Sequence, residues 1–172
     1  MPASATYTPI ATATVSGGST SEVEFASISG SYTDLIIVGN LGAATNSYPG
    51  ARFNSDTGSN YSVTNLSGDG STALSNRGSS RSIADISYEV LVGSAINLNF
   101  IAQIMNYSNS TTYKTMLSRT NNAGTGTSAT VVLWRSTNAI TNIKLYSATT
   151  NGANLYNFAA GSTFTLYGIL SA

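Results

Sequence analysis

Short runs in which polar and apolar side chains alternate are the feature that most constrains the fold of this chain. Near its end, within residues 158–169, Thr163, Thr165 and Tyr167 alternate with apolar residues. Side chains two apart in a strand share a face, so this pattern predicts a β-strand with one face on a core. We predict that residues 139–146, with a similar mixture, form the neighbouring strand of the same sheet.

Similar runs recur along the chain, separated by Gly, Asn and Ser, which are typical of turns. The runs interpreted as strands are residues 7–15, 22–25, 32–40, 51–54, 61–66, 97–107, 113–120, 127–134, 139–146 and 158–169. About nine or ten strands predict an all-β fold, a two-sheet antiparallel β-sandwich of jelly-roll-like type. An immunoglobulin-type sandwich is the less favoured alternative. We expect a single domain over residues 1–172, with residues 1–10 as an N-terminal arm.

Several local features refine this picture. Pro9 cannot donate to a β-ladder, so its strand belongs at a sheet edge or at a strand start. Residues 35–38 are all apolar and predict a central strand that is buried on both faces. Residues 51–54 and 61–66 flank a turn-rich loop and predict a hairpin. Residues 68–80 are polar and predict an exposed loop.

Residues 82–92 are ambiguous. Ile83, Ile86 and Val90 fall at helical spacing, and Ser82 with Asp85 has the pattern of a capping box. The alternatives are a short helix and a loop followed by a strand.

The composition excludes several classes of function. The chain contains no Cys and no His, so it has no disulfide, no thiolate metal site and none of the usual histidine general bases. Lys plus Arg and Asp plus Glu are each 7, which argues against nucleic-acid or anionic-membrane binding. We expect no enzymatic activity, no cofactor and no bound metal. Only 8% of residues are charged, and such proteins tend to associate.

The N-terminal residues have neither a basic nor an apolar segment, and no apolar run approaches the roughly 20 residues of a membrane span. We therefore expect a protein that is made in a cytoplasm and is released only by lysis.

Three groups of residues carry alternative interpretations. Asn54, Asp56 and Asn60 could contribute oxygens to a Ca²⁺ site, but a turn whose side chains bond to its own backbone is favoured, since Asp56 is the sole acid. Glu22 and Glu24 share a strand face, and a solvated face is favoured over a glycosidase pair. Trp134 ends an apolar run and is assigned to the core or its rim, with sugar stacking or an interface as the alternative.

Four stretches together resemble a known family. They are RFNSDTGSNY at 52–61, MNYSNSTTYKT at 105–115, WRSTNAITNI at 134–143 and FAAGSTFTLYGI at 158–169. In this order they resemble small β-sandwich, jelly-roll-like virion structural proteins of tailed bacteriophages, of the cyanophage and marine-phage type. Residues 81–98 share the least of this pattern. The resemblance implies a non-catalytic component of the virion, assembled in the host cytoplasm.

Within a virion, the sequence favours a capsid decoration (cement) protein bound to the major capsid shell. The alternative is a tail-fibre, adaptor or receptor-binding tip protein, with or without carbohydrate binding. A third hypothesis is a carbohydrate-binding module, because Trp134 and the tyrosines could stack on glycans. A tip protein commonly carries an upstream shaft, whereas here the strands begin close to Met1, which favours decoration. The expected partners are other virion proteins. We also expect a small homo-oligomer, with a trimer as the favoured state. The interface candidates come from the loops 54–60 and 68–80 and from the arm 2–10, with Trp134 as a further candidate. They are Tyr7, Pro9, Ile10, Asn54, Asp56, Asn60, Asp69 and Trp134.

Overall fold

The structure, a computed structural model, describes residues 6–17, 20–93 and 95–170. These residues form thirteen β-strands and one short 3₁₀ turn at Thr150–Gly152, with no α-helix among them. The all-β prediction is therefore confirmed.

The strands form two antiparallel sheets. The larger, eight-stranded sheet contains β1 (Tyr7–Thr14), β3 (Asp34–Leu41), β5 (Tyr61–Gly68), β6 (Ala73–Arg81), β8 (Leu98–Met105), β9 (Lys114–Asn122), β10 (Gly126–Trp134) and β13 (Thr163–Ile169). The smaller, five-stranded sheet contains β2 (Glu22–Phe25), β4 (Tyr48–Phe53), β7 (Ala84–Asp85), β11 (Ile143–Ala148) and β12 (Leu155–Tyr156).

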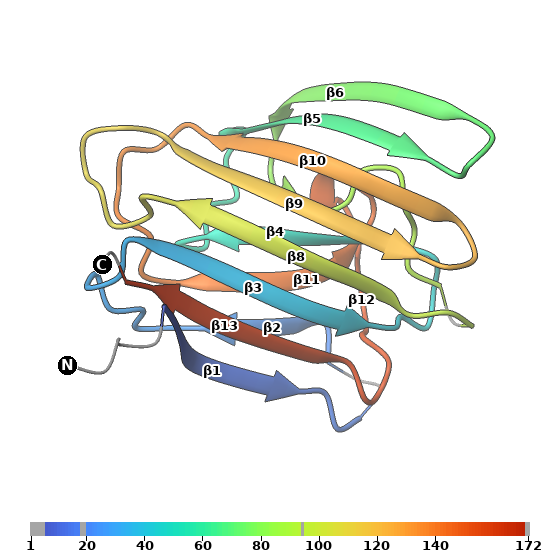
Figure 1. Cartoon of the computed structure of the whole chain (residues 1–172), viewed down its shortest axis with the longest axis horizontal. Helices are drawn as coiled ribbons and strands as arrows, with labels where there is room; N and C mark the ends of the chain where they lie inside the picture. Colours follow the sequence, from blue (N-terminus) through green and yellow to red (C-terminus); the bar gives the residue numbers. More distant parts are fainter. Residues whose placement is uncertain (1–5, 18–19, 94, 171–172) are drawn as a thin grey trace.

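The order of strands in the large sheet is β1-β13-β3-β8-β9-β10-β5-β6, so strands distant in sequence lie side by side. In the small sheet, β11 pairs with β4 on one side and with β2 and β12 on the other. Figure 1 shows the large sheet as one layer and β2, β4 and β11 as the layer behind it. This is the expected two-layer sandwich with jelly-roll-like connections.

The core lies between the two sheets. Leu35 and Leu166 of the large sheet and Leu145 of the small sheet are almost fully buried in one hydrophobic cluster. Gly39 faces the Phe100 ring, where a Cβ would come within 2.2 Å of a ring carbon, so only glycine lets the ring lie this close to the strand.

The predicted pairing of residues 139–146 with 158–169 is wrong. β11 and β13 lie in different sheets, and the neighbours of β13 are β1 and β3. Both strands present alternate apolar residues to the same core, which is why their patterns look alike although they do not pair.

The predicted hairpin of residues 51–54 and 61–66 is also wrong, because β4 and β5 belong to opposite sheets. The connecting loop starts with Asn54 and Ser55, which both have positive φ values, of 52° and 56°. Because β4 and β5 lie in opposite sheets, this loop carries the chain from one layer to the other.

One polar segment for which the sequence predicts a loop is a strand. Residues 73–80 of the predicted loop 68–80 belong to β6, which pairs with β5 at the edge of the large sheet. Its side chains are mostly exposed, so no apolar alternation marks it in the sequence. Residues 7–10 of the predicted arm belong to β1, which confirms the strand predicted over residues 7–15, while residues 1–5 lie outside the described residues. The edge position predicted from Pro9 is confirmed, and the register shifts between Pro9 and Ala11.

Residues 82–92 form no helix. Ile83, Ile86 and Val90 are buried at spacing that resembles a helix because the chain crosses the end of the core with β7 as its only strand. Asp85 caps no helix. It accepts a hydrogen bond from Arg81 Nε at 3.0 Å and forms an ion pair with Arg81, whose Nη2 atom lies 2.9 Å from its Oδ2 atom.

Burial raises the pKa of Asp85 to about 6, although the Arg81 guanidinium acts in the opposite direction. The folded protein thus holds this proton more tightly than the unfolded chain, whose carboxyl has a pKa of 3.8. The protonated Asp85 carboxyl therefore adds to the free energy of unfolding. This contribution is complete below about pH 4 and is lost as the pH rises through about 6, and the loss amounts to about 3 kcal/mol.

We therefore predict that urea-unfolding midpoints of the wild type decrease between about pH 4.5 and pH 7.5. Asp85→Asn should remove this decrease, since the variant has no proton to lose there. A wild-type stability that is flat over this range would contradict the prediction.

Candidate functional site

The outer face of the large sheet exposes apolar side chains to solvent. The antiparallel register places its outward side chains in four rows that cross the strands, each named here by its residue on β8. The Met105 row is Tyr7, Ile169, Asp34, Met105, Thr115, Leu133 and Ser62. The Gln103 row is Pro9, Tyr167, Ile36, Gln103, Leu117, Val131, Thr64 and Arg77. The Ile101 row is Thr12, Thr165, Val38, Ile101, Arg119, Ala129, Leu66 and Ser75. The Asn99 row is Thr14, Thr163, Asn40, Asn99, Asn121, Thr127 and Gly68.

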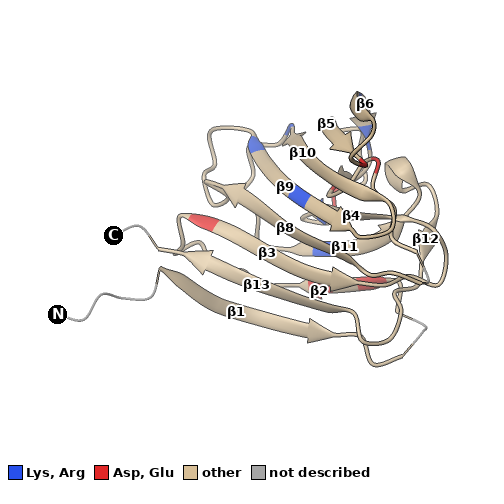
Figure 2. Ribbon diagram, turned by 45° about the vertical axis from the view of Figure 1, so that its right-hand side comes forward, with Lys and Arg blue, Asp and Glu red and all other residues tan. Residues whose placement is uncertain are grey.

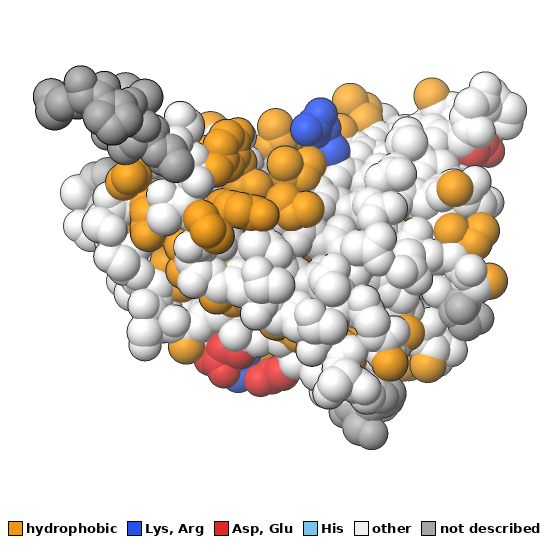
Figure 3. Space-filling view, turned by 60° about the horizontal axis from the view of Figure 1, so that its bottom comes forward, with side chains coloured by type: hydrophobic (Ala, Val, Ile, Leu, Met, Phe, Trp, Pro, Cys, Tyr) orange, Lys and Arg blue, Asp and Glu red, His pale blue; other side chains and the backbone are white. Residues whose placement is uncertain are grey.

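The Met105 and Gln103 rows form what we call the apolar half of this face. Met105 is 46% exposed, Leu117 43% and Val131 47%, although sheets that face water normally carry polar side chains there. Exposed apolar surface of this kind marks interaction sites. Figure 3 shows hydrophobic side chains gathered in the upper left of the view, at one end of the molecule.

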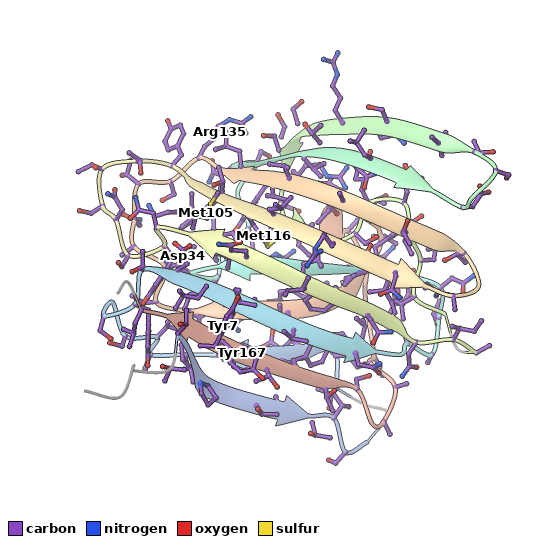
Figure 4. The ribbon with its side chains drawn as sticks, in the orientation of Figure 1. Tyr7, Asp34, Met105, Met116, Arg135 and Tyr167 are labelled. Atoms are coloured by element: carbon purple, nitrogen blue, oxygen red, sulfur yellow. The ribbon has the colours of Figure 1, made fainter. Side chains whose placement is uncertain are left out.

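Two aromatic side chains of the apolar half come from the edge strand β1 and from its neighbour β13. Tyr7 of β1 and Tyr167 of β13 meet edge to face, with ring centroids 6.5 Å apart. Figure 4 shows these two rings with Asp34 and Met105 on neighbouring strands at one end of the sheet. The apolar half therefore reaches from the sheet edge to its middle.

Two charged side chains lie in this half, Asp34 and, on the edge strand β6, Arg77. Figure 2 shows none on β1 or β13. Asp34 accepts hydrogen bonds from Gln103 Nε2 at 3.0 Å and from the Asn106 backbone N–H at 2.9 Å. Both oxygens of the Asp34 carboxylate therefore accept a hydrogen bond within the protein, which lowers the free-energy cost of removing water from this side chain.

The outer face of the small sheet is polar by contrast. Lys144 on β11 lies 2.9 Å from Glu22 and 4.0 Å from Glu24 on β2. The hydrogen bond from Lys144 lowers the pKa of Glu22. The Arg52 guanidinium lies over the Tyr146 ring, 5.0 Å from its centroid. The solvated face predicted for Glu22 and Glu24 is confirmed, since their side chains are 42% and 40% exposed.

The predicted site residues of loop 54–60 fold onto the protein itself. Asp56 Oδ1 accepts the Gly58 N–H at 2.8 Å, and the Asn60 amide bonds to both carboxylate oxygens of Asp56. Asn54 Oδ1 accepts the backbone N–H groups of Thr141 and Asn142 ahead of β11. The self-bonded turn is confirmed, and the described residues contain no group of three or more Asp or Glu that could hold a metal ion.

Trp134 lies in the core, 2% exposed, beside Phe53 and Tyr61. Its Nε1 atom donates to Asp56 Oδ2 at 2.7 Å. Burial opposes ionisation of Asp56, but the hydrogen bonds from Trp134, Asn60 and Gly58 outweigh it and lower the pKa of its carboxyl. The core position predicted for Trp134 is confirmed, and its ring is not available to stack on a sugar.

The remaining candidates are spread over the molecule. Tyr7 and Pro9 lie in the apolar half, whereas Ile10 sits at the register shift of β1 and packs against the core. Asp69 lies in the β5–β6 turn, where the backbone N–H groups of Thr72 and Ser71 lower its pKa to about 2. The structure thus joins Asn54, Asp56, Asn60 and Trp134 in one corner and separates them from Tyr7, Pro9 and Asp69.

Most of the apolar half was not among the predicted site residues. A signal for an apolar outer face exists in the sequence, because residues 35–38 of β3 and 101–105 of β8 include apolar side chains in both phases of the alternation. The run 35–38 was assigned to a strand covered on both faces. Ile36 is buried, but Val38 is 43% exposed, so the second face is only partly covered in the single chain.

No protein-family model matches the chain, and no curated protein sequence matches it. Among solved structures it is similar to the galectin LEC-6 of Caenorhabditis elegans, with 8% identity and a TM-score of 0.35, over 93% of this chain and 96% of that chain. It is also similar to a xylan β-1,4-xylosidase of Bacillus halodurans, with 8% identity and a TM-score of 0.31, over 81% of this chain and 28% of the enzyme. Similarity this low carries no information on function. No helix in the described residues is long and apolar enough to cross a membrane.

The contact between Asp56 and Trp134 yields a prediction about stability. Asp56→Ala leaves the buried Trp134 N–H without its acceptor and should lower the free energy of unfolding by about 1–3 kcal/mol. In a Trp134→Phe background the same change should cost less, because the donor is already gone. Urea unfolding of both single variants and the double variant measures this coupling.

Asp69→Ala is the control, since the Asp69 carboxylate serves only its own exposed turn. Purely additive losses in the double variant would show that Asp56 and Trp134 do not stabilise one another.

Proposed function

We propose that this protein is a non-enzymatic virion structural protein of a tailed bacteriophage, in the first place a capsid decoration protein that binds the major capsid shell. The observation that carries the proposal is the exposed apolar half of the large sheet. The sequence resemblance to small β-sandwich virion proteins points in the same direction.

The chemistry of the apolar half suits binding between protein subunits. Its aliphatic and tyrosine side chains gain free energy when water leaves them, at about 25 cal/mol per Å² of apolar area. The rigid strands hold these side chains in place, so little conformational entropy is lost on binding. The near absence of charge means that few charged groups lose hydration in the contact.

Three ionisable side chains outside this surface, Lys114, Asp85 and Asp56, have their partners within the fold. Lys114 is buried and donates to the carbonyl oxygens of Thr112 and Thr137, at 2.7 and 3.1 Å. These contacts tie the segments before β9 and after β10 together. Asp85 and Asp56 are likewise held by Arg81 and Trp134. This use of the charged groups supports a structural role.

The number of copies in the particle tests the assignment. Quantitative mass spectrometry of purified virions should find on the order of hundreds of copies, because a shell repeats its subunits by symmetry. A few copies or a few dozen would instead favour the alternative, a tail-fibre, adaptor or receptor-binding tip protein.

We expect the isolated protein to form a small homo-oligomer, a trimer above all, through the apolar half. Leu117→Asp places a charge in the middle of this surface and should shift the protein to monomers at micromolar concentration, as measured by native mass spectrometry. Leu155→Asp is a matched control, since Leu155 is exposed to a similar degree but lies on β12 of the other sheet. A wild type that is monomeric, or a control that dissociates equally, would contradict this role of the apolar half.

A further inference from the structure

A groove of about 740 Å³ lies on the other half of the same face, over the Ile101 and Asn99 rows. Its volume is within the range of sites for small molecules. Aliphatic side chains on its surface come from Val38, Ile101, Ala129 and Leu66. Polar side chains beside them come from Asn40, Asn99, Asn121, Thr127, Thr163 and Thr165. The groove thus offers both apolar contact and hydrogen bonds.

Arg119 lines this groove and is exposed. Its neighbours across the strands are Ile101 and Ala129, which are uncharged. Within the described residues, its guanidinium has no carboxylate within ion-pair distance and no hydrogen-bond partner. Five N–H donors are therefore free to bind an anion from outside.

A chain of amides adds further donors next to Arg119. Asn97 Nδ2 donates to Asn40 Oδ1 at 2.7 Å, and Asn40 Nδ2 donates to Asn99 Oδ1 at 2.5 Å. This direction of donation uses the Asn99 oxygen and leaves its amide NH₂ group free. Asn121 is directly opposite Asn99 in the β8–β9 pair. The rim of the groove is therefore rich in donors.

No acid balances these donors within the groove, because none of its lining residues is Asp or Glu. Asp69 in the adjoining β5–β6 turn directs its Oδ1 atom to the N–H groups of Ser71 and Thr72. Asp34 lies in the Met105 row and is held by Gln103 and Asn106. The groove is thus a positively charged hollow on a protein of zero net charge.

We propose that this groove binds a saccharide that carries a carboxylate, of the uronic acid class. The carboxylate pairs with the planar fork of Arg119, which matches its geometry and its single charge. The ring hydroxyls accept from Asn99 and Asn121, and the C–H face of the sugar ring lies on Ile101 and Val38. A phosphate, with nearly two charges, would leave charge unbalanced by the single cation. The site is separate from the apolar half, so the proposal does not depend on the proposed virion function.

The test uses trigalacturonate as the probe, with its methyl ester as the uncharged control. In an NMR titration of the whole protein at low salt, trigalacturonate should shift the Arg119, Asn99 and Asn121 signals at millimolar concentration or below. The ester should bind at least tenfold more weakly. Arg119→Ala should weaken trigalacturonate binding at least tenfold. Arg119→Lys should have an affinity between those of the wild type and Arg119→Ala, because lysine keeps the charge but lacks the planar guanidinium.

Arg77→Ala is the matched control, since Arg77 is exposed on β6 of the same sheet and is not among the groove-lining residues. It should leave binding unchanged, and a thermal melt of each variant verifies that it is folded. The proposal is overturned if trigalacturonate does not bind, if the ester binds equally well, or if Arg119→Ala binds like the wild type. Equal binding of hexanoate would overturn the saccharide assignment, because hexanoate has the carboxylate without the ring hydroxyls.

Discussion

The burial of one face of the large sheet against the small sheet is the interaction on which the rest of the structure depends. Residues such as Leu35, Leu166 and Leu145 lose contact with water there, and this burial orients the central strands of the large sheet. Because successive side chains of a strand face opposite sides, fixing the inner set also fixes the outer set. The four rows of the outer face, including the apolar half and the groove, are therefore a consequence of how the core is packed.

Local conformation could be read from the sequence, but strand partners could not. The alternation in 163–167 identifies a strand because it reports which side chains are buried. It does not report which sheet buries them, and β11 and β13 meet the same core from opposite layers. The segment 73–81 was missed for the converse reason. As an edge strand with exposed side chains it carries no apolar pattern, and only its pairing with β5 defines it.

The candidate site shows the same division. The turn centred on Asp56 was predictable, because its contacts to Gly58 and Asn60 lie within a few residues. The contact from Trp134 was not, since it spans 78 residues and depends on the β5–β10 pair. The groove is less predictable still. Arg119 and Asn99 become neighbours only through the register of β8 with β9, which no short stretch of sequence encodes.

The edge at β1 has a consequence for assembly. Pro9 offers no N–H to a further strand, and the register shift beside it breaks the regular spacing of the backbone groups. Both features disfavour the addition of a further strand at this edge, and so work against open-ended polymerisation by strand addition. A face-to-face contact built on a two-fold or three-fold axis closes instead, and a complex of that kind stops growing at a finite size.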